Sequence, residues 1–418
     1  TAAVLQDNAA EISRRLGREV RISAVCDLSE EKARQICPSA AFVKDPFELV
    51  AREDVDVLVE LCGGTGIAKD AVLKAIENGK HIVTANKKLL AEYGNEIFPL
   101  AEEKNVMVQF EAAVAGGIPI IKALREGLAA NRIRSIAGII NGTSNFILSE
   151  MREKGSAFAD VLKEAQALGY AEADPTFDIE GNDAGHKITI MSALAFGTPM
   201  NFSACYLEGI SKLDSRDIKY AEEFGYRIKL LGITRKTDKG IELRVHPTLI
   251  PESRLLANVN GVMNAVRVNA DMVGETLYYG AGAGALPTAS AVVADIIDIA
   301  RLIEANTDHR VPHLAFQPAQ VQAQTILPMD EITSSYYLRV QAKDEPGTLG
   351  QIAALLAKEN VSIEALIQKG VIDQTTAEIV ILTHSTVEKN IKRAIAAIEA
   401  LSCVEKPITM IRMESLHD

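Results

Sequence analysis

The fold is decided by residues 55–84, which read VDVLVELCGGTGIAKDAVLKAIENGKHIVT. An apolar run over residues 55–61 predicts a buried strand, and a glycine-rich turn follows it. The helical spacing of apolar residues over 67–77 stops shortly before a second apolar run at 81–84, which predicts the next strand. A strand, a helix and a strand in this order are typical of a parallel β-α-β unit.

The same alternation continues on both sides of this stretch. Upstream, the patterns predict a helix over residues 5–16 and a strand over 20–26. Downstream, they predict a helix over 91–104 and a strand over 106–110. Residues 1–110 are therefore predicted to form an α/β domain with a Rossmann-like, doubly wound parallel sheet.

The rest of the chain predicts further domains. Residues 111–288 mix helical and strand patterns. The apolar helix predicted over 289–304 is expected to pack back on the first domain, and the proline-containing stretch 307–332 is expected to be a linker. Residues 333–418 follow the order βαββαβ, which is the ferredoxin-like arrangement.

The composition excludes several classes of function. The 44 lysines and arginines against 56 aspartates and glutamates give a net charge of −12, which disfavours binding to nucleic acid or to an anionic membrane. The five cysteines show no spacing typical of zinc or redox sites, and no apolar run is long enough to span a membrane. The N-terminus shows no secretory signal pattern. We expect a protein of a reducing, cytoplasmic compartment that binds neither nucleic acid nor membrane.

Polar residues at the carboxyl ends of the predicted strands are candidates for ligand binding, because ligands of parallel sheets bind there. Asp27 could accept hydrogen bonds from a cofactor ribose, or it could cap the helix that follows it. The turn from Gly63 to Gly66 could let the backbone approach a cofactor, or it could be a plain tight turn. Lys87 follows the strand at 81–84 and is either an ammonium of the cofactor site or a solvated surface lysine.

One expected feature of a dinucleotide site is absent from the sequence. The motif G-x-G-x-x-G after an opening strand normally places the pyrophosphate at a helix N-terminus. Either a strand and a glycine loop precede Thr1 in the parent protein, or the chain does not bind a dinucleotide in the usual way. The first alternative is favoured, because a parallel sheet without its central strand would be difficult to fold.

The densest group of functional polar residues lies over residues 169–190. Asp183 and Lys187 are four residues apart, so a helix that begins at Asn182 would place them on one face, where they can pair. Because the helix continues into an apolar stretch, the pair is expected at the mouth of a buried helix and not on a solvated surface. Glu172 adds a third charge nearby in sequence.

A loop of small polar residues, Asn141-Gly-Thr-Ser-Asn145, follows the strand predicted over 133–140. Its hydroxyl and N–H donors could hold a ligand carboxylate, or the loop could be a simple capped turn. His186 would face elsewhere on the helix and is interpreted as structural.

Several motifs together resemble the bacterial homoserine dehydrogenase family. They are Thr84-Ala-Asn-Lys-Lys88, Phe110-Glu-Ala-Ala-Val-Ala-Gly-Gly-Ile-Pro119, Asn141-Gly-Thr-Ser-Asn145, Gly169-Tyr-Ala-Glu-Ala-Asp-Pro175, Gly181-Asn-Asp-Ala-Gly-His-Lys187 and Tyr279-Gly-Ala-Gly-Ala-Gly-Ala-Leu-Pro-Thr-Ala-Ser290. Another motif, Asp344-Glu-Pro-Gly-Thr-Leu-Gly350, resembles an ACT regulatory domain. The resemblance implies an α+β catalytic and dimerisation domain over 111–288, an ACT domain over 333–418, and NAD(P)-dependent interconversion of L-homoserine and L-aspartate 4-semialdehyde.

The resemblance also implies roles for individual residues. Lys187 would be the acid and base of the reaction, while Asp183 and Glu172 would hold the substrate. Thr143 would reach the substrate as well, and Lys87 would lie at the junction of cofactor and substrate. The remaining implied residues are Gly282 and Gly284 at the nicotinamide nucleotide, and Glu111 with the backbone carbonyls of Val114, Gly116 and Ile118 at a sodium ion.

At the level of the whole protein, the resemblance implies a homodimer or homotetramer of threonine and methionine biosynthesis, with L-threonine as a feedback effector of the ACT domain. An Asp27 carboxylate at the cofactor ribose would favour NAD over NADP, because it would repel a 2′-phosphate. Two alternatives stay open: another NAD(P)-dependent reductase of amino-acid metabolism on the same fold, and a non-catalytic amino-acid sensor.

Overall fold

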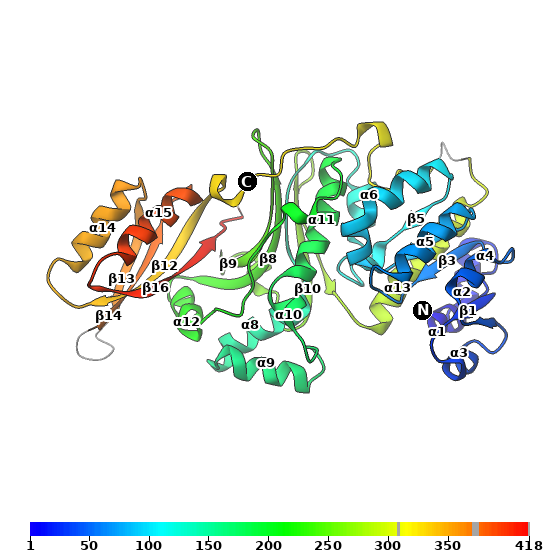
Figure 1. Cartoon of the computed structure of the whole chain (residues 1–418), viewed down its shortest axis with the longest axis horizontal. Helices are drawn as coiled ribbons and strands as arrows, with labels where there is room; N and C mark the ends of the chain where they lie inside the picture. The colour runs from blue at the N-terminus through cyan, green and yellow to red at the C-terminus, as the bar shows by residue number, and fades with distance from the viewer. Residues whose placement is uncertain (307–309, 370–375, 417–418) are drawn as a thin grey trace. The chain divides into compact units, whose positions relative to one another are not determined.

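The computed structural model describes residues 1–306, 310–369 and 376–416 (Figure 1). The chain divides into two compact units, each made of segments that are distant in sequence. The first unit comprises Thr1–Ile136, His186–Ser203 and Met263–Gln324, and the second comprises Ala137–Gly185, Ala204–Val262 and Thr325–Asp418. The division falls inside one helix, α11 (Asn182–Phe196). The predicted domain limits stay a prediction.

The first unit contains the predicted parallel strands. Strand β3 (Val57–Glu60) pairs in parallel with β4 (His81–Thr84), which pairs in parallel with β5 (Val108–Gln109). Strands β1 (Ala24–Cys26) and β2 (Ala41–Val43) form a separate parallel pair. The expected single sheet is therefore present as two pieces, because no strand within the described residues pairs with both β1 and β3.

Helices follow these strands as the alternation predicts. Helix α5 has the predicted bounds, whereas α6 begins four residues earlier than expected, because Asn86 caps it by accepting a hydrogen bond from the Leu89 amide. The helix predicted over 5–16 is divided at Asn8 into two. The helices of this part are α1 (Ala2–Asp7), α2 (Ala9–Leu16), α3 (Glu30–Ile36), α4 (Pro46–Ala51), α5 (Ile67–Glu77) and α6 (Lys87–Glu103).

Helix α13 (Ala285–Leu302), far along the chain, packs on the parallel strands. Its residues Val292 and Ile299 are fully buried and share a core with Val83 of β4 and with Met107. The other elements of the first unit are the short helices η1 (Glu111–Ala113) and α7 (Ile120–Lys122), the π-helical turn η2 (Ala123–Gly127), and the antiparallel strands β10 (Met263–Ala270) and β11 (Gly274–Ala281).

The second unit places helices beside a long antiparallel pair. Strands β8 (Tyr226–Lys236) and β9 (Ile241–Pro251) pair along their full length, and the short strand β7 (Tyr206–Leu207) adds to β9 in parallel. Strand β6 (Ile133–Ile139) leads into this region. The helices of this region are α8 (Gly142–Lys154), α9 (Phe158–Ala167), α10 (Thr176–Ile179) and α12 (Ser215–Glu223).

The C-terminal part of the second unit has the predicted ferredoxin-like order. The strand order β16-β12-β14-β13 places the first and third strands in the middle of the sheet. Ile352 and Leu356 of α14 and Ile391 and Ile398 of α15 are buried against the strands, so both helices cover one face (Figure 1). The elements are β12 (Thr333–Lys343), α14 (Thr348–Lys358), β13 (Ile363–Lys369), β14 (Thr376–Thr383), β15 (Thr386–Val387), α15 (Glu388–Glu399) and β16 (Val404–Met413).

The C-terminal sheet is joined to the rest of the second unit. Strand β16 pairs in parallel with β9, where Arg412 lies opposite Thr248. The end of the stretch predicted as a linker is ordered here, since Ile326 forms a bridge with Ile241. No helix in the described part of the chain is long and apolar enough to cross a membrane.

Candidate active site

Helix α11 carries the two charged residues that sequence spacing places on one face. The helix begins at Asn182, as predicted, after Gly181 turns the chain with a φ of 85°. Asp183 is 3% exposed and Lys187 is 8% exposed, while the following helix residues Ile188 and Met191 are fully buried. The two charged groups are therefore held in a buried helix and do not form a solvated surface pair.

Asn141 ties Asp183 to a second carboxylate, that of Asp178 in α10. Its side-chain Nδ2 donates to Asp183 Oδ2 at 2.8 Å and to Asp178 Oδ1 at 2.7 Å. Its Oδ1 caps helix α8 by accepting from the Ser144 amide at 2.8 Å. The capped-turn interpretation of this loop is thus correct in part, and the same residue also gathers two carboxylates. Sequence reasoning missed this role of Asn141, although its position directly after a strand was a signal.

Asp178 also receives hydrogen bonds from the start of α8. Thr143 Oγ1 lies 3.0 Å from Asp178 Oδ2 and 2.7 Å from the Tyr170 carbonyl, and Ser144 Oγ donates to the Asp178 carbonyl at 3.1 Å. The Thr143 hydroxyl proton is therefore already used within the protein. The amides of Gly142 and Thr143 in the first turn of α8, which have no acceptor inside the helix, are the better donors for a ligand carboxylate.

Glu172 lies on the turn that connects α9 and α10. Its side chain is exposed, and its backbone carbonyl accepts from Gln166 Nε2 at 3.1 Å. His186, interpreted as structural, packs its ring against Phe202 with centroids 4.1 Å apart. The structure thus brings Thr143 and Asp183 into one buried network through Asn141 and Asp178, and leaves Glu172 at the surface.

A second cluster lies in the first unit, at the carboxyl ends of β3 and β4. Thr84 Oγ1 donates to Glu60 Oε2 at 2.6 Å, and Glu60 Oε1 accepts from the Gly63 amide at 2.8 Å. Asn86 Nδ2 donates to the Gly64 carbonyl at 2.7 Å. The glycine turn is therefore anchored to this edge, and Lys87 begins helix α6 beside it. Ligands of parallel sheets bind at such an edge.

Two further side chains, Asp27 after β1 and Cys62 after β3, have local roles. The Asp27 carboxylate is exposed and accepts from the Ser29 amide at 2.8 Å, while Ser29, not Asp27, caps helix α3. Burial raises the pKa of the Cys62 thiol to about 11, with a smaller contribution from its hydrogen bond to Glu60. Cys62 is therefore protonated at neutral pH and is not a nucleophile.

The loop with Gly116 packs against the segment that begins α13. A Cβ atom at Gly116 would lie 2.4 Å from the Gly282 carbonyl oxygen, and one at Gly282 would lie 1.9 Å from Asn264 Nδ2. Close packing alone therefore requires glycine at both positions. Gly284 differs, because it is exposed, has a φ of 118° and precedes the first turn of α13, an 18-residue helix. Such an N-terminus attracts phosphate.

Glu111 is a buried carboxylate at the start of this loop. It is 3% exposed, and its two oxygens accept from the amides of Ile121 at 2.8 Å and Lys122 at 2.9 Å. Burial raises the pKa of Glu111, and it raises the pKa of Asp295, which accepts from the Glu111 amide, to about 7. Within residues 1–306, 310–369 and 376–416, no group of three or more His, Cys, Asp or Glu side chains could hold a metal ion.

Family models match three parts of the chain. The model described as homoserine dehydrogenase matches residues 119–297, and the model described as the NAD binding domain of homoserine dehydrogenase matches 1–111. The ACT domain model matches residues 336–403. The C-terminal βαββαβ part is therefore an ACT domain.

Whole-chain relatives agree with these matches. A curated homoserine dehydrogenase of Neisseria gonorrhoeae is 94% identical over 417 residues, covering 100% of this chain and 96% of the relative. The structure of a homoserine dehydrogenase from Thiobacillus denitrificans is 60% identical with a TM-score of 0.95, covering 99% of this chain and 95% of that one. A hyperthermophilic archaeal homoserine dehydrogenase in complex with NADPH is 28% identical with a TM-score of 0.60, covering 73% of this chain and 95% of that one. The chain belongs to the homoserine dehydrogenase family of NAD(P)-dependent oxidoreductases.

Proposed function

We propose that this chain interconverts L-homoserine and L-aspartate 4-semialdehyde, with Lys187 as the acid and base. The observation that carries this proposal is the start of α11, where Lys187 follows Asp183 by one turn, both are buried, and Asn141 holds the Asp183 carboxylate at 2.8 Å. A nicotinamide cofactor, when bound, supplies or accepts the hydride.

Lys187 meets the demand that the reduction makes on the protein. When the aldehyde carbon gains a hydride, its oxygen develops into an alkoxide, which needs a proton and a nearby positive charge. A lysine ammonium provides both. In the oxidation of homoserine, a neutral Lys187 takes the hydroxyl proton back. Orientation by Asp183 on the same helix face keeps the ammonium where the oxygen forms.

The substrate also keeps an α-ammonium and an α-carboxylate throughout the reaction. The carboxylates of Asp183 and Glu172 suit the ammonium, and the first-turn amides of α8 next to Thr143 suit the carboxylate. Asp178 and Asn141, which hold Thr143 and Asp183, are positioning residues for the same site.

The residues of the first unit fit a dinucleotide. The exposed N-terminus of α13 at Gly284 suits a phosphate, and the Lys87 ammonium, beside the anchored turn of Gly63 and Gly64, suits a second anionic group. Asp27, exposed at the end of β1, would accept from ribose hydroxyls. We propose these residues as the cofactor site, and Asp27 as a reason for NAD to be favoured over NADP.

The Glu111 loop fits a monovalent cation such as sodium. Burial disfavours the charged form of Glu111, and a bound cation would stabilise that form. The backbone carbonyls of Val114, Gly116 and Ile118 would complete an all-oxygen donor set. Sodium chloride should then raise the unfolding temperature more than choline chloride at equal ionic strength. Glu111→Gln should remove that difference; equal stabilisation of the wild-type protein by both salts would refute the site.

We further propose that the enzyme acts in threonine and methionine biosynthesis, as a homodimer or homotetramer of the cytoplasm, with L-threonine as a feedback effector of the ACT domain. Helix α14 begins after Gly347, and the amides of Leu349 and Gly350 in its first turn, which have no acceptor inside the helix, suit an amino-acid carboxylate. The five described cysteines are free thiols, in keeping with a reducing compartment. Indifference of the activity to millimolar L-threonine would refute the effector.

The reaction is tested by following NADPH oxidation with L-aspartate 4-semialdehyde and NADP reduction with L-homoserine. Activity with both substrates and none with other hydroxy acids or aldehydes supports the proposal. Activity only on a different substrate would point to another reductase on this fold, and no activity on any would point to a sensor.

A further inference from the structure

Arg412, the penultimate residue of β16 in the ACT domain, joins two parts of the second unit. It is 1% exposed, and its guanidinium makes a bidentate pair with Glu388 of α15, each contact 2.7 Å. A third contact, also 2.7 Å, joins it to Glu208, which follows β7, and it lies over the ring of Tyr206. The ACT domain thus reaches Glu208 through one buried cation.

Glu208 has little freedom to move independently of this contact. Its amide donates to the Val245 carbonyl at 2.9 Å, extending the pairing of β7 with β9. Its carboxylate accepts from the Tyr206 hydroxyl at 2.7 Å as well as from Arg412. Backbone and side chain are therefore both fixed at this position.

Gly209, which follows Glu208, contacts the turn between α10 and α11. A Cβ atom at Gly209 would lie 2.4 Å from the Ile179 carbonyl oxygen and 2.4 Å from the Glu180 carboxylate, so the two backbones touch. The Ile210 amide donates to the Ile179 carbonyl at 2.8 Å. A shift of residues 208–210 must therefore move residues 179–180.

Residues 179–181 lie between the two carboxylates of the candidate substrate site. Asp178 precedes them and holds Asn141 and Thr143, and Asp183 follows them and is held by Asn141. Gly181 packs closely against β9, since a Cβ there would lie 3.0 Å from Val245 Cγ1.

From these contacts we infer that Arg412 and Glu208 are positioning residues for the substrate-binding carboxylates, so that the ACT domain completes the substrate site. This inference rests on the proposed function of Asp183 and Thr143. It requires no effector, since the contacts exist in the ACT domain as it stands.

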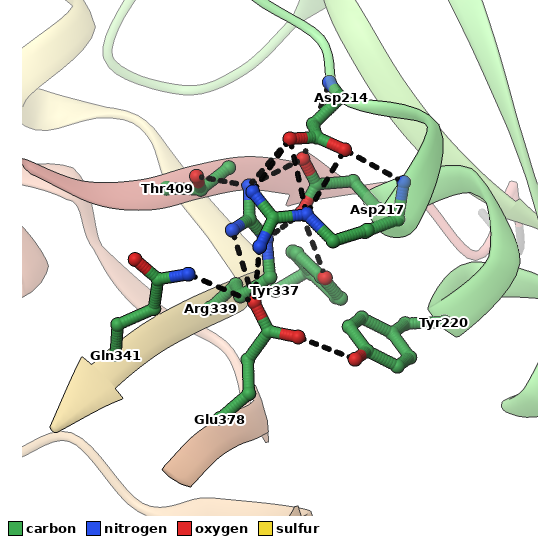
Figure 2. Close-up of polar contacts among 9 residues, drawn as sticks. Asp214, Asp217, Tyr220, Tyr337, Arg339, Gln341, Glu378 and Thr409 are labelled. Carbon is green, nitrogen blue, oxygen red and sulfur yellow. Dashed lines mark hydrogen bonds and ion pairs between the residues drawn. The ribbon is translucent and has the colours of Figure 1, made fainter. Parts of the chain in front are cut away.

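A second arginine of the ACT domain offers a matched control (Figure 2). Arg339 of β12 is 8% exposed and pairs with Asp217 of α12 at 2.6 Å and with Glu378 of β14 at 3.2 Å. Like Arg412, it bridges a carboxylate inside the ACT domain and one outside it. Its partner outside the ACT domain is on α12, whereas the partner of Arg412 is joined to residues 179–180.

The test compares Arg412→Met, Glu208→Ala and the double variant with Arg339→Met, at a temperature where all are folded. Arg412→Met and Glu208→Ala should each raise KM for L-homoserine about tenfold, a coupling of usual size for residues in one network, without changing KM for the cofactor. KM for L-homoserine in the double variant should be no higher than in either single variant, because each substitution removes the same contact between Arg412 and Glu208. Glu208→Gln, which keeps an acceptor for Arg412, should recover most of the loss.

Two results would overturn the inference. One is an equal rise of KM in Arg339→Met, which would mean that any loosening of the ACT domain has this effect. The other is a KM of Arg412→Met within about twofold of wild type, far below the expected coupling. Hydrogen exchange of the amides of residues 179–183 should also be faster in Arg412→Met than in Arg339→Met. This measurement needs no activity, so it decides the positioning role even if homoserine is not the substrate.

Discussion

Asp183 at the start of α11 and Asp217 at the start of α12 are both buried, yet different groups hold them. Asp183 accepts from the neutral side-chain amide of Asn141. Asp217 accepts from the guanidinium of Arg339 at 2.6 and 3.0 Å and from the hydroxyl of Tyr337 at 2.9 Å. An amide side chain is thus one donor to Asp183, whereas Asp217 is paired with an arginine.

This difference separates a binding region from a structural one. A carboxylate oxygen that accepts from one side-chain amide can still accept a hydrogen bond from a ligand ammonium, because each oxygen has two lone pairs. A buried carboxylate paired with arginine has no charge left to offer, and removal of its partner leaves an uncompensated charge. Variants in the first region should therefore change catalysis, and variants in the second should change stability.

The largest effect is expected for Lys187→Ala. Loss of the proton donor should lower turnover by about a hundredfold to ten-thousandfold. The affinity for NADPH, measured by fluorescence titration, should change little, because the residues proposed to hold the cofactor are untouched. Lys163→Ala, on the exposed side of α9, is the control and should keep wild-type turnover. Turnover above a third of wild type in Lys187→Ala would place the acid and base elsewhere.

The next-largest effect is a loss of stability, expected in the cluster around Arg339, Asp217 and Glu378 (Figure 2). Arg339→Met leaves the buried Asp217 without its guanidinium partner, while Glu378 keeps Arg216, so the free energy of unfolding should fall by about 3 to 5 kcal/mol. Arg216→Met, in the same cluster but with a side chain 44% exposed, should cost at most about 1 kcal/mol. Urea unfolding measures both. An equal loss of unfolding free energy in Arg339→Met and Arg216→Met would mean that burial does not determine how much each arginine contributes to stability.

A smaller effect is expected for Asp178→Asn. The substituted amide has one oxygen and cannot accept from both Asn141 Nδ2 and Thr143 Oγ1, so Asp178 loses one of these two contacts, while Thr143 still donates to the Tyr170 carbonyl and Asn141 to Asp183. We expect KM for L-homoserine to rise about tenfold, the value of one hydrogen bond to a charged group. Asp174→Asn, on the exposed turn before α10, is the control. An unchanged KM in Asp178→Asn would mean that Asp178 does not position the substrate site.

The sequence predicted features that depend on local pattern. Helix α5 and strand β4 have the expected bounds because each is specified by its own periodicity and by the turn at Asn78 and Gly79. The face shared by Asp183 and Lys187 follows from their spacing alone. The ferredoxin-like order of the C-terminal part could also be predicted, because each of its strands and helices has its own local periodicity.

Features that depend on contacts between residues far apart in the sequence could not be predicted from it. Arg412 and Glu208 are 204 residues apart, so no local pattern indicates that they meet. The family resemblance implies Gly282 at the nicotinamide nucleotide, but only the fold shows that a Cβ atom there would overlap the side chain of Asn264. Asp178 stood within the polar cluster, but only the fold shows that it joins Asn141 to Thr143.

Lys229 of β8 sharpens the comparison, because it is a buried cation held by neutral acceptors. Its ammonium lies 2.6 Å from the Val259 carbonyl and 3.2 Å from the side-chain oxygens of Asn145 and Asn260. Burial lowers the pKa of Lys229 to about 7, with smaller contributions from Arg152 and Arg227. Lys229 should therefore lose its proton near neutral pH, whereas Arg339 and Arg412, which are paired with carboxylates, stay charged.

The last prediction follows from the direction of this shift. Between pH 7 and the unfolded pKa of about 10.4, the unfolded chain binds more protons at Lys229 than the folded chain, so stability rises with pH. Wild-type protein should gain about 1 to 2 kcal/mol more than Lys229→Met between pH 7 and 8.5. Lys163→Met should follow the wild-type slope, because that side chain is exposed in the folded state. Urea unfolding at several pH values gives the three slopes, and a slope in Lys229→Met equal to that of wild type would show that neutral acceptors hold this charge as firmly as a carboxylate would.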